Sequence, residues 1–270
     1  MSIPDYYANN LLDRLRITSV GDLQLLDLIA RERGSLVQDK PLKGAEARIA
    51  IVGRKAIITV STLIADPRRR RFSIAHELGH FEMHRTHGNL ALCTEADLED
   101  WSSKRAGVER EQEANQFAAA LLLPDRFFAA RCKRQDPSLD SIAKLADAFN
   151  VSLTATAIRF MQFTSEPCAV VFSKDGYIKW FHESKSFKEL GLFIEVHSKP
   201  DPATLAATLF DRRSTSSRPR RVRARAWFSS GSVREDATIV EQSWIFSEYG
   251  TVLSLLWVDD DIEDFEIDDE

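Results

Sequence analysis

The stretch RFSIAHELGHFEMHR, residues 71–85, holds three of the six histidines in the chain. Two of them, His76 and His80, enclose Glu77 in the pattern H-E-x-x-H. Residues four apart lie on one face of an α-helix, so both imidazoles can reach a single cation. Glu77 then lies beside the pair, where its carboxylate can contact a water molecule on the metal. The pattern predicts a zinc site.

The flanking sequence predicts how this stretch folds. Asp66 followed by Pro67 is typical of a helix start, which gives a helix from Pro67 to about His84. Upstream, two β-branched runs on either side of Gly53 predict a hairpin over residues 47–61. Two short helices are expected before that hairpin.

A catalytic zinc site needs a third protein ligand. The next predicted helix, RAGVEREQEANQFAAALLLP at residues 105–124, offers Glu109, Glu111 and Glu113. Glu111 has Asn115 four residues later, so one side chain can bind the metal while the other accepts from a ligating histidine. Glu111 is therefore the preferred third ligand, and Glu113 is the alternative.

The two helices in this order resemble the ImmA/IrrE family of metallo-endopeptidases, whose members share an A-H-E-[LI]-G-H helix and a later E-x-E-A-[ND] helix. The resemblance covers residues 45–165 or so. It implies a zincin-like fold, zinc held by His76, His80 and Glu111, and Glu77 as general base. It also implies a substrate class, helix-turn-helix transcriptional repressors, whose cleavage would derepress a stress or mobile-element response. The strand at 56–61 is expected to hold the substrate backbone by strand addition.

The predicted secondary structure changes after residue 166, from mostly helices to mostly strands. We therefore predict an α+β fold with two domains. Residues 1–165 form the peptidase domain, including a scaffold helix pair at 139–163, and residues 166–270 form a smaller mixed α/β domain that regulates or recognises. Some family members carry a sensor-like domain similar to a GAF domain there, and the length and strand content of this region suit one.

The composition of the chain limits the cellular compartment and the classes of binding partner that we expect. No apolar run is long enough to span a membrane and no secretory signal is seen at the N-terminus, so we expect a cytoplasmic protein without a membrane partner. Nine of the 41 acidic side chains lie in the last thirteen residues, while arginines cluster at 68–71 and 212–225. Nucleic acid is thus a weaker candidate partner than a protein substrate.

Two alternatives remain open at this level. The chain can be a DNA- or partner-binding regulator with a non-catalytic metal site, but such a site is normally closed by four ligands and only three are evident. Cys93, in the loop between the two metal helices, is a candidate inhibitory fourth ligand, although an inert thiol is the simpler expectation. His84, at the next helical turn, is expected to have a surface or structural use.

Overall fold

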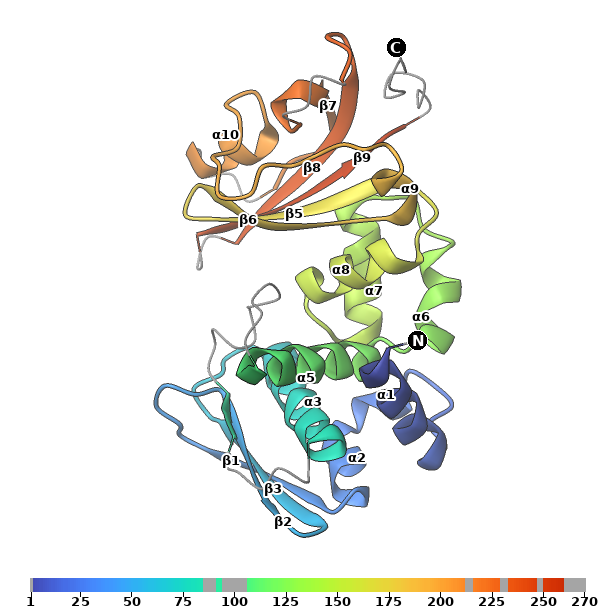
Figure 1. Cartoon of the computed structure of the whole chain (residues 1–270), viewed down its shortest axis with the longest axis vertical. Helices are drawn as coiled ribbons and strands as arrows, with labels where there is room; N and C mark the ends of the chain where they lie inside the picture. Colours follow the sequence, from blue (N-terminus) through green and yellow to red (C-terminus); the bar gives the residue numbers. More distant parts are fainter. Residues whose placement is uncertain are drawn as a thin grey trace. The chain divides into compact units, whose positions relative to one another are not determined.

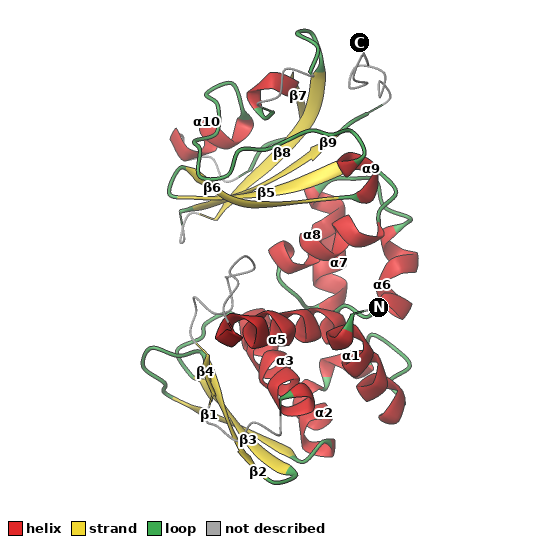
Figure 2. Ribbon diagram, viewed as in Figure 1, coloured by secondary structure: helices red, strands yellow, loops and turns green. Residues whose placement is uncertain are grey.

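The computed structural model describes residues 2–84, 91–93, 106–211, 216–228, 233–246 and 250–259. Its contacts divide the chain into two compact units. The first comprises Met1–Phe128 with Ala146–Ser152, and the second comprises Ala129–Leu145 with Leu153–Glu270. Helices accompany a sheet in both, so the predicted α+β fold is confirmed (Figures 1 and 2).

The first unit packs helices against one side of a four-stranded sheet (Figure 1). Its helices are α1 (Ile3–Arg14), the short 3-10 helix η1 (Asp22–Gln24), α2 (Leu26–Glu32), α3 (Pro67–Met83) and α5 (Ala106–Leu122). Its strands are β1 (Ser35–Lys40), β2 (Ala47–Val52), β3 (Lys55–Ser61) and β4 (Ala91–Cys93). The two opening helices, the hairpin and both metal-helix candidates were predicted, whereas β1 was not.

The strand order β1-β3-β2-β4 corrects one prediction about substrate binding. Strand β3 pairs in parallel with β1 and antiparallel with β2, so both of its edges are already hydrogen-bonded. A substrate strand cannot be added to residues 56–61 because no main-chain edge is left there. Among the described strands, the sheet edges belong to β1 and β4.

Helix α3 begins as the sequence predicted. The Asp66 side chain accepts a hydrogen bond from the backbone N–H of Arg68 at 2.8 Å, and Pro67 occupies the first turn. Toward its end, Glu82 forms a two-pronged ion pair with Arg33 at 2.8 and 2.9 Å. Both side chains are largely buried, so the pair fixes α3 against the end of α2.

The arginine cluster at 68–71 is used within the first unit. Each of its four side chains has an acceptor there: Asp147 for Arg68, Glu46 for Arg69, Asp27 and Asp39 for Arg70, and the carbonyls of Leu23 and Gln24 for Arg71. The cluster therefore connects the start of α3 to the surrounding strands and helices. These internal contacts are the use that the structure shows for the cluster.

The second unit is built on a five-stranded antiparallel sheet of order β6-β5-β9-β8-β7. The strands are β5 (Cys168–Lys174), β6 (Tyr177–Glu183), β7 (Arg220–Arg223), β8 (Thr238–Phe246) and β9 (Thr251–Trp257). Its helices are α8 (Leu153–Phe163), α9 (Lys185–Lys188), α10 (Leu205–Asp211) and the short 3-10 helix η3 (Ala224–Ala226). Helices α6 (Asp125–Cys132) and α7 (Leu139–Phe149) each contribute residues to both units.

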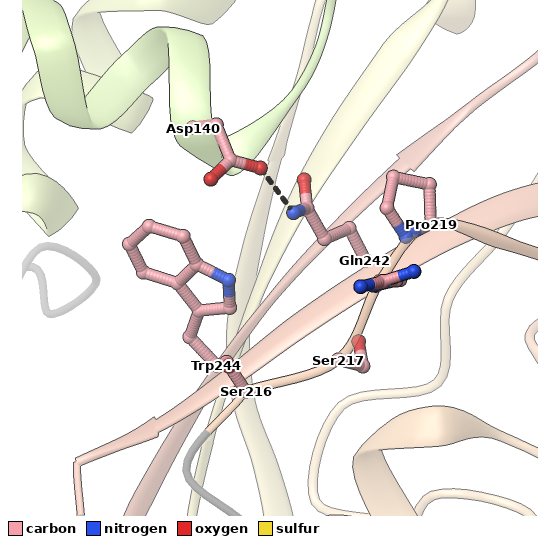
Figure 3. A pocket seen from close by; sticks show the side chains of 7 residues that line it. Asp140, Ser216, Ser217, Pro219, Gln242 and Trp244 are labelled. Atoms are coloured by element: carbon pink, nitrogen blue, oxygen red, sulfur yellow. Dashed lines mark hydrogen bonds between the residues drawn. The ribbon is translucent and has the colours of Figure 1, made fainter.

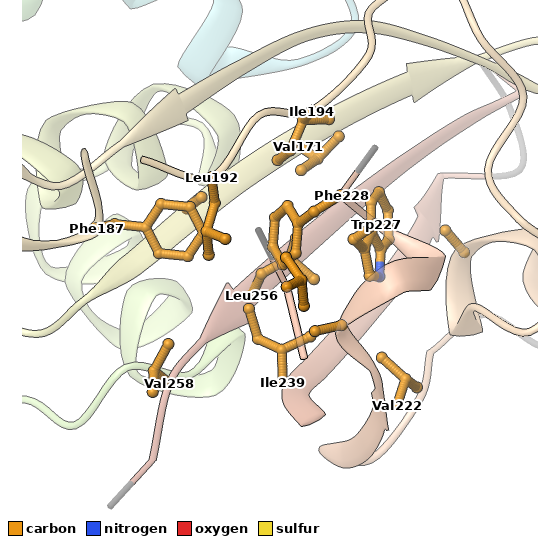
Figure 4. Packing of buried hydrophobic residues seen from close by; sticks show 14 of the residues in the cluster. Val171, Phe187, Leu192, Ile194, Val222, Trp227, Phe228, Ile239, Leu256 and Val258 are labelled. Carbon is orange, nitrogen blue, oxygen red and sulfur yellow. The ribbon is translucent and has the colours of Figure 1, made fainter. Parts of the chain in front are cut away.

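One face of this sheet carries an apolar core that includes aromatic side chains of the loops and of α9 (Figure 4). Phe187, Trp227 and Phe228 pack there against Val171 and Leu256 of the inner strands. After β7 the chain turns into η3 at Ala224. The turn places both Trp227 and Phe228 in the core, which a flat strand with alternating faces cannot do.

The predicted domain boundary after residue 165 stays a prediction. Contacts assign α8 and most of α7 to the second unit, with only Ala146–Ser152 in the first. Met161 of α8 lies against Cys168 of β5, with their sulfur atoms 3.7 Å apart. No helix in the described part of the chain has the length and apolarity needed to cross a membrane.

Candidate metal centre

The centre depends on the close approach of α3 and α5. Gly79, inside the H-E-x-x-H pattern, lies where a Cβ atom would be 3.1 Å from the Cα of Ala114 and 3.1 Å from the Phe117 ring. Contacts this short are tighter than most real Cβ contacts, so a residue without a side chain favours this close approach of the two helices. Ala114 and Phe117 are fully buried, so the contact is part of the core of the first unit.

Three potential ligand atoms meet between these helices. The Nε2 atom of His76 lies 3.0 Å from Nε2 of His80 and 3.1 Å from Oε2 of Glu111, and the third side of the triangle is 3.4 Å. The histidines are buried, while the Glu111 side chain is 21% exposed. The described residues hold no other group of His, Cys, Asp or Glu atoms gathered in this way.

This triangle fits zinc. Bonds of about 2.0–2.1 Å in a tetrahedron separate neighbouring ligand atoms by about 3.3 Å. The observed separations of 3.0, 3.1 and 3.4 Å match three corners of such a tetrahedron. Two imidazoles and one carboxylate are also the ligand set of one class of catalytic zinc sites. His76, His80 and Glu111 are therefore the residues that can hold the metal.

Neighbouring groups bias these ligands toward binding a cation. Burial opposes ionisation of Glu111, but hydrogen bonds with His76 and then His80 outweigh it and hold the pKa of that carboxyl well below its usual range. Oδ1 of Asn115 lies 2.9 Å from Nδ1 of His76. If that nitrogen carries the proton, the lone pair of Nε2 points into the triangle, as the helical spacing of Glu111 and Asn115 predicted.

Glu113, the alternative third ligand, lies elsewhere. Its Oε2 is 2.8 Å from Nε2 of His84, and Nδ1 of His84 is 3.1 Å from Nδ1 of His80. Burial lowers the pKa of His84, against the opposing hydrogen bond to Glu113. His84 was expected to have only a surface or structural use. The sequence contained a signal for this contact, because α5 carries two glutamates near the histidines of α3. Glu111 faces the metal ligands, and Glu113 faces His84.

The remaining sequence candidates are placed as follows. Glu77 is fully buried on α3, between the two histidines in sequence. The backbone of Cys93 ends strand β4 and pairs with Ala47, but its side chain lies outside the described part of the structure. His87 also lies outside it. The inhibitory role considered for Cys93 thus remains a prediction.

The second unit contains a separate pocket of about 330 Å³, lined by polar side chains and by Trp244 (Figure 3). Gln242, one of its lining residues, is 2% exposed and donates to Asp140 at 2.7 Å. The Gln242 carbonyl accepts from the backbone N–H of Leu139 at 2.7 Å. Because both ends of this amide are hydrogen-bonded within the protein, its visible role is to hold the start of α7 on β8.

The surfaces considered for DNA binding are also partly occupied by the protein itself. In α8, Arg159 is 7% exposed, donates to Gln162 and stacks on the Phe163 ring at 5.0 Å. In the basic run, Arg221 pairs with Asp259 at 2.7 Å. The rest of the acidic tail, and residues 212–215 of the basic run, lie outside the described residues.

The part of the chain that contains the α3–α5 centre is similar to a known protein family. Residues 30–161 match the family described as Peptidase_M78, IrrE N-terminal-like domain. A solved structure titled "Mycobacterium tuberculosis transcriptional regulator" is similar in fold, with a TM-score of 0.64 at 18% identity, over 95% of this chain and 76% of the other. No curated protein matched the sequence. The α3–α5 centre lies within the matched residues, so it belongs to the part of the chain that is similar to the IrrE N-terminal-like, M78 peptidase family.

Proposed function

We propose that this protein is a zinc-dependent endopeptidase that cuts a peptide bond in a protein substrate. The observation that carries the proposal is the triangle of His76, His80 and Glu111 inside an M78 peptidase domain, whose dimensions suit a tetrahedral metal. The family resemblance supplies the substrate class, a helix-turn-helix transcriptional repressor. Cleavage of such a repressor would release a stress or mobile-element response.

In this proposal, three residues hold the metal and a fourth, Glu77, transfers a proton. When bound, zinc supplies Lewis-acid chemistry, polarising a peptide carbonyl and making water acidic enough to lose a proton near neutral pH. His76, His80 and Glu111 would hold the ion. Glu77 takes the proton of the attacking water on its carboxylate and passes it to the leaving amine nitrogen. The peptide C–N bond breaks, and one water molecule is consumed.

Substrate recognition falls to the remaining surfaces. Because β3 is internal, an extended substrate can pair with the sheet only at an edge strand, β1 or β4 among those described. We propose that the substrate pairs with β4, because this strand follows the metal helix α3 in the chain. The second unit then recognises or regulates. We place the protein in the cytoplasm, where transcriptional repressors are found.

The rival function is a DNA- or partner-binding regulator whose metal site is not catalytic. Among the described residues only three ligand atoms meet, which disfavours it, because structural zinc sites are closed by four protein ligands. The burial of Arg159 disfavours DNA reading by α8 as well. The exposed arginines of β7 remain the surface on which such a regulator would depend.

Incubation with a helix-turn-helix repressor, chosen from those encoded beside the gene of this protein, separates the two functions. We expect two fragments whose masses together exceed that of the repressor by one water, and a chelator should prevent their formation. Glu77→Gln should lower the cleavage rate by at least about 10²-fold while keeping the metal, because Glu77 is not a ligand. Repressor that binds the protein but is left intact by the zinc-loaded wild type would favour the rival, and full cleavage by Glu77→Gln would exclude Glu77 as the base.

A further inference from the structure

The outer nitrogen of each ligand histidine faces a polar partner, but the two partners differ. His76 meets Asn115 directly, whereas His80 meets a second histidine that in turn meets a carboxylate. His84 and Glu113 have 13% and 40% of their side chains exposed, so the chain of contacts runs from the buried triangle toward the surface. Neither residue offers an atom to the triangle itself.

The hydrogen bonds from His80 through His84 to Glu113 can be assigned in only one direction once His80 binds a metal through Nε2. Its proton is then on Nδ1, and Nδ1 lies 3.1 Å from Nδ1 of His84, which must accept. The neutral His84 ring therefore carries its own proton on Nε2 and donates it to Glu113 at 2.8 Å. The Glu113 carboxylate ends this series of hydrogen bonds, because an ionised carboxylate is an acceptor only.

We propose that His84 and Glu113 are positioning residues, which hold His80 in the tautomer and ring orientation that zinc binding requires. The inference rests on the proposed zinc site and deepens it. Outer partners of a ligating histidine fix its tautomer and raise its basicity, and their loss commonly weakens metal binding by about 10–100-fold. Glu113 acts through His84, so its effect depends on that ring being present.

The test is zinc affinity, measured by competition with a chromophoric chelator at fixed pH. His84→Ala should weaken binding by about 10–100-fold. Glu113→Ala should weaken it to a similar or smaller extent, whereas Glu113→Gln, which keeps an acceptor oxygen, should recover most of the loss. The double variant should be no weaker than His84→Ala, because the two residues form one path. Glu109→Ala, which removes an exposed carboxylate from the same helix, is the matched control and should bind like the wild type.

A cobalt-loaded sample gives a second readout, because the visible absorption of cobalt reports the ligand field. His84→Ala should shift that spectrum while the stoichiometry stays near one. Melting of the metal-free proteins checks the fold, and His84→Gln, which still offers an acceptor, replaces His84→Ala if the latter fails to fold. It should then bind more tightly than His84→Phe, which offers none.

Affinities of the His84 and Glu113 variants equal to that of Glu109→Ala, or losses that add in the double variant, would overturn the relay. Equal affinities of His84→Gln and His84→Phe would do the same. These outcomes differ from failure of the proposed function. In that case the wild type itself binds no zinc tightly, or binds zinc and leaves the repressor intact.

Discussion

Burial shifts the pKa of two ionisable side chains in the second unit, Glu241 and His182. In the second unit, Glu241 is fully buried and accepts from the backbone N–H groups of Leu205 and Ala206. It also accepts from the Trp227 indole and the Ser243 hydroxyl. Burial raises the pKa of Glu241 although all four donors oppose the shift. The carboxyl thus connects the start of α10 to β8 within one hydrogen-bond network.

His182 shows the same effect with the opposite charge, and it gives a prediction. Burial lowers its pKa from the ordinary 6.5, and its ring lies 5.3 Å from that of Trp180. Below about pH 6.5 the unfolded chain takes up a proton that the folded state resists, so the free energy of unfolding should fall with falling pH. We expect His182→Phe to lose less stability than the wild type between pH 7.5 and 5.5, measured as urea midpoints.

A matched control for this measurement is His197→Asn, on an exposed turn of the same unit with φ of +68°. Asparagine tolerates that backbone conformation, so the fold should be kept. Its pH dependence should follow that of the wild type. If His182→Phe also follows the wild type, the folded-state pKa of His182 is not depressed.

Among the elements, the packing of α3 on α5 matters most, because the metal triangle spans both helices. Gly79→Ala adds a methyl group 3.1 Å from a backbone atom of α5, which must move by a few tenths of an ångström. The helix gains up to about 1 kcal/mol of propensity, so stability changes little or in either direction. Zinc affinity should nevertheless fall on the order of tenfold, because the ligands are held by both helices.

Gly21→Ala is the control for that prediction. Its Cβ would be 3.5 Å from the nearest atom, an ordinary contact, and its φ of −61° suits alanine. Zinc titration of both variants decides the matter. Equal affinities would show that the triangle tolerates separation of the helices.

The sequence predicted those elements whose signals are local. Asp66 with Pro67 marked the start of α3, and the β-branched runs around Gly53 marked the hairpin, because capping and turn chemistry act over a few residues. Within α5, helical spacing also predicted that Glu111 and Asn115 share one face. The contact between His84 and Glu113 was not predicted, because it depends on how two helices cross, which neither helix encodes alone. The internal position of β3 was likewise set by a strand, β1, that had no clear signal.

For the whole molecule, the open question is where an independent second unit begins. The backbone around residue 166 is bound to that unit: Ser184 donates to the Glu166 carbonyl at 2.7 Å, and Val258 donates to that of Pro167 at 3.0 Å. Helix α8 is bound there as well, through Met161, and Asp140 of α7 through Gln242. A fragment that begins at residue 166 would expose the sheet face on which α8 packs.

We therefore expect fragment 129–270 to be more stable than fragment 166–270. Each large apolar side chain returned to water costs roughly 1.5–3 kcal/mol, so the loss of α8 should be readily measurable. Urea unfolding followed by circular dichroism compares the two. Equal midpoints, with a cooperative transition in the shorter fragment, would instead favour the boundary predicted after residue 165.

The central claim is that His76, His80 and Glu111 hold one zinc ion, and metal analysis of the purified protein tests it most directly. The wild type should retain close to one zinc per chain after dialysis, and so should Glu109→Ala. His80→Ala and Glu111→Ala should retain far less, because each removes one of only three protein ligands among the described residues. Full zinc content in Glu111→Ala, or none in the wild type, would contradict the account.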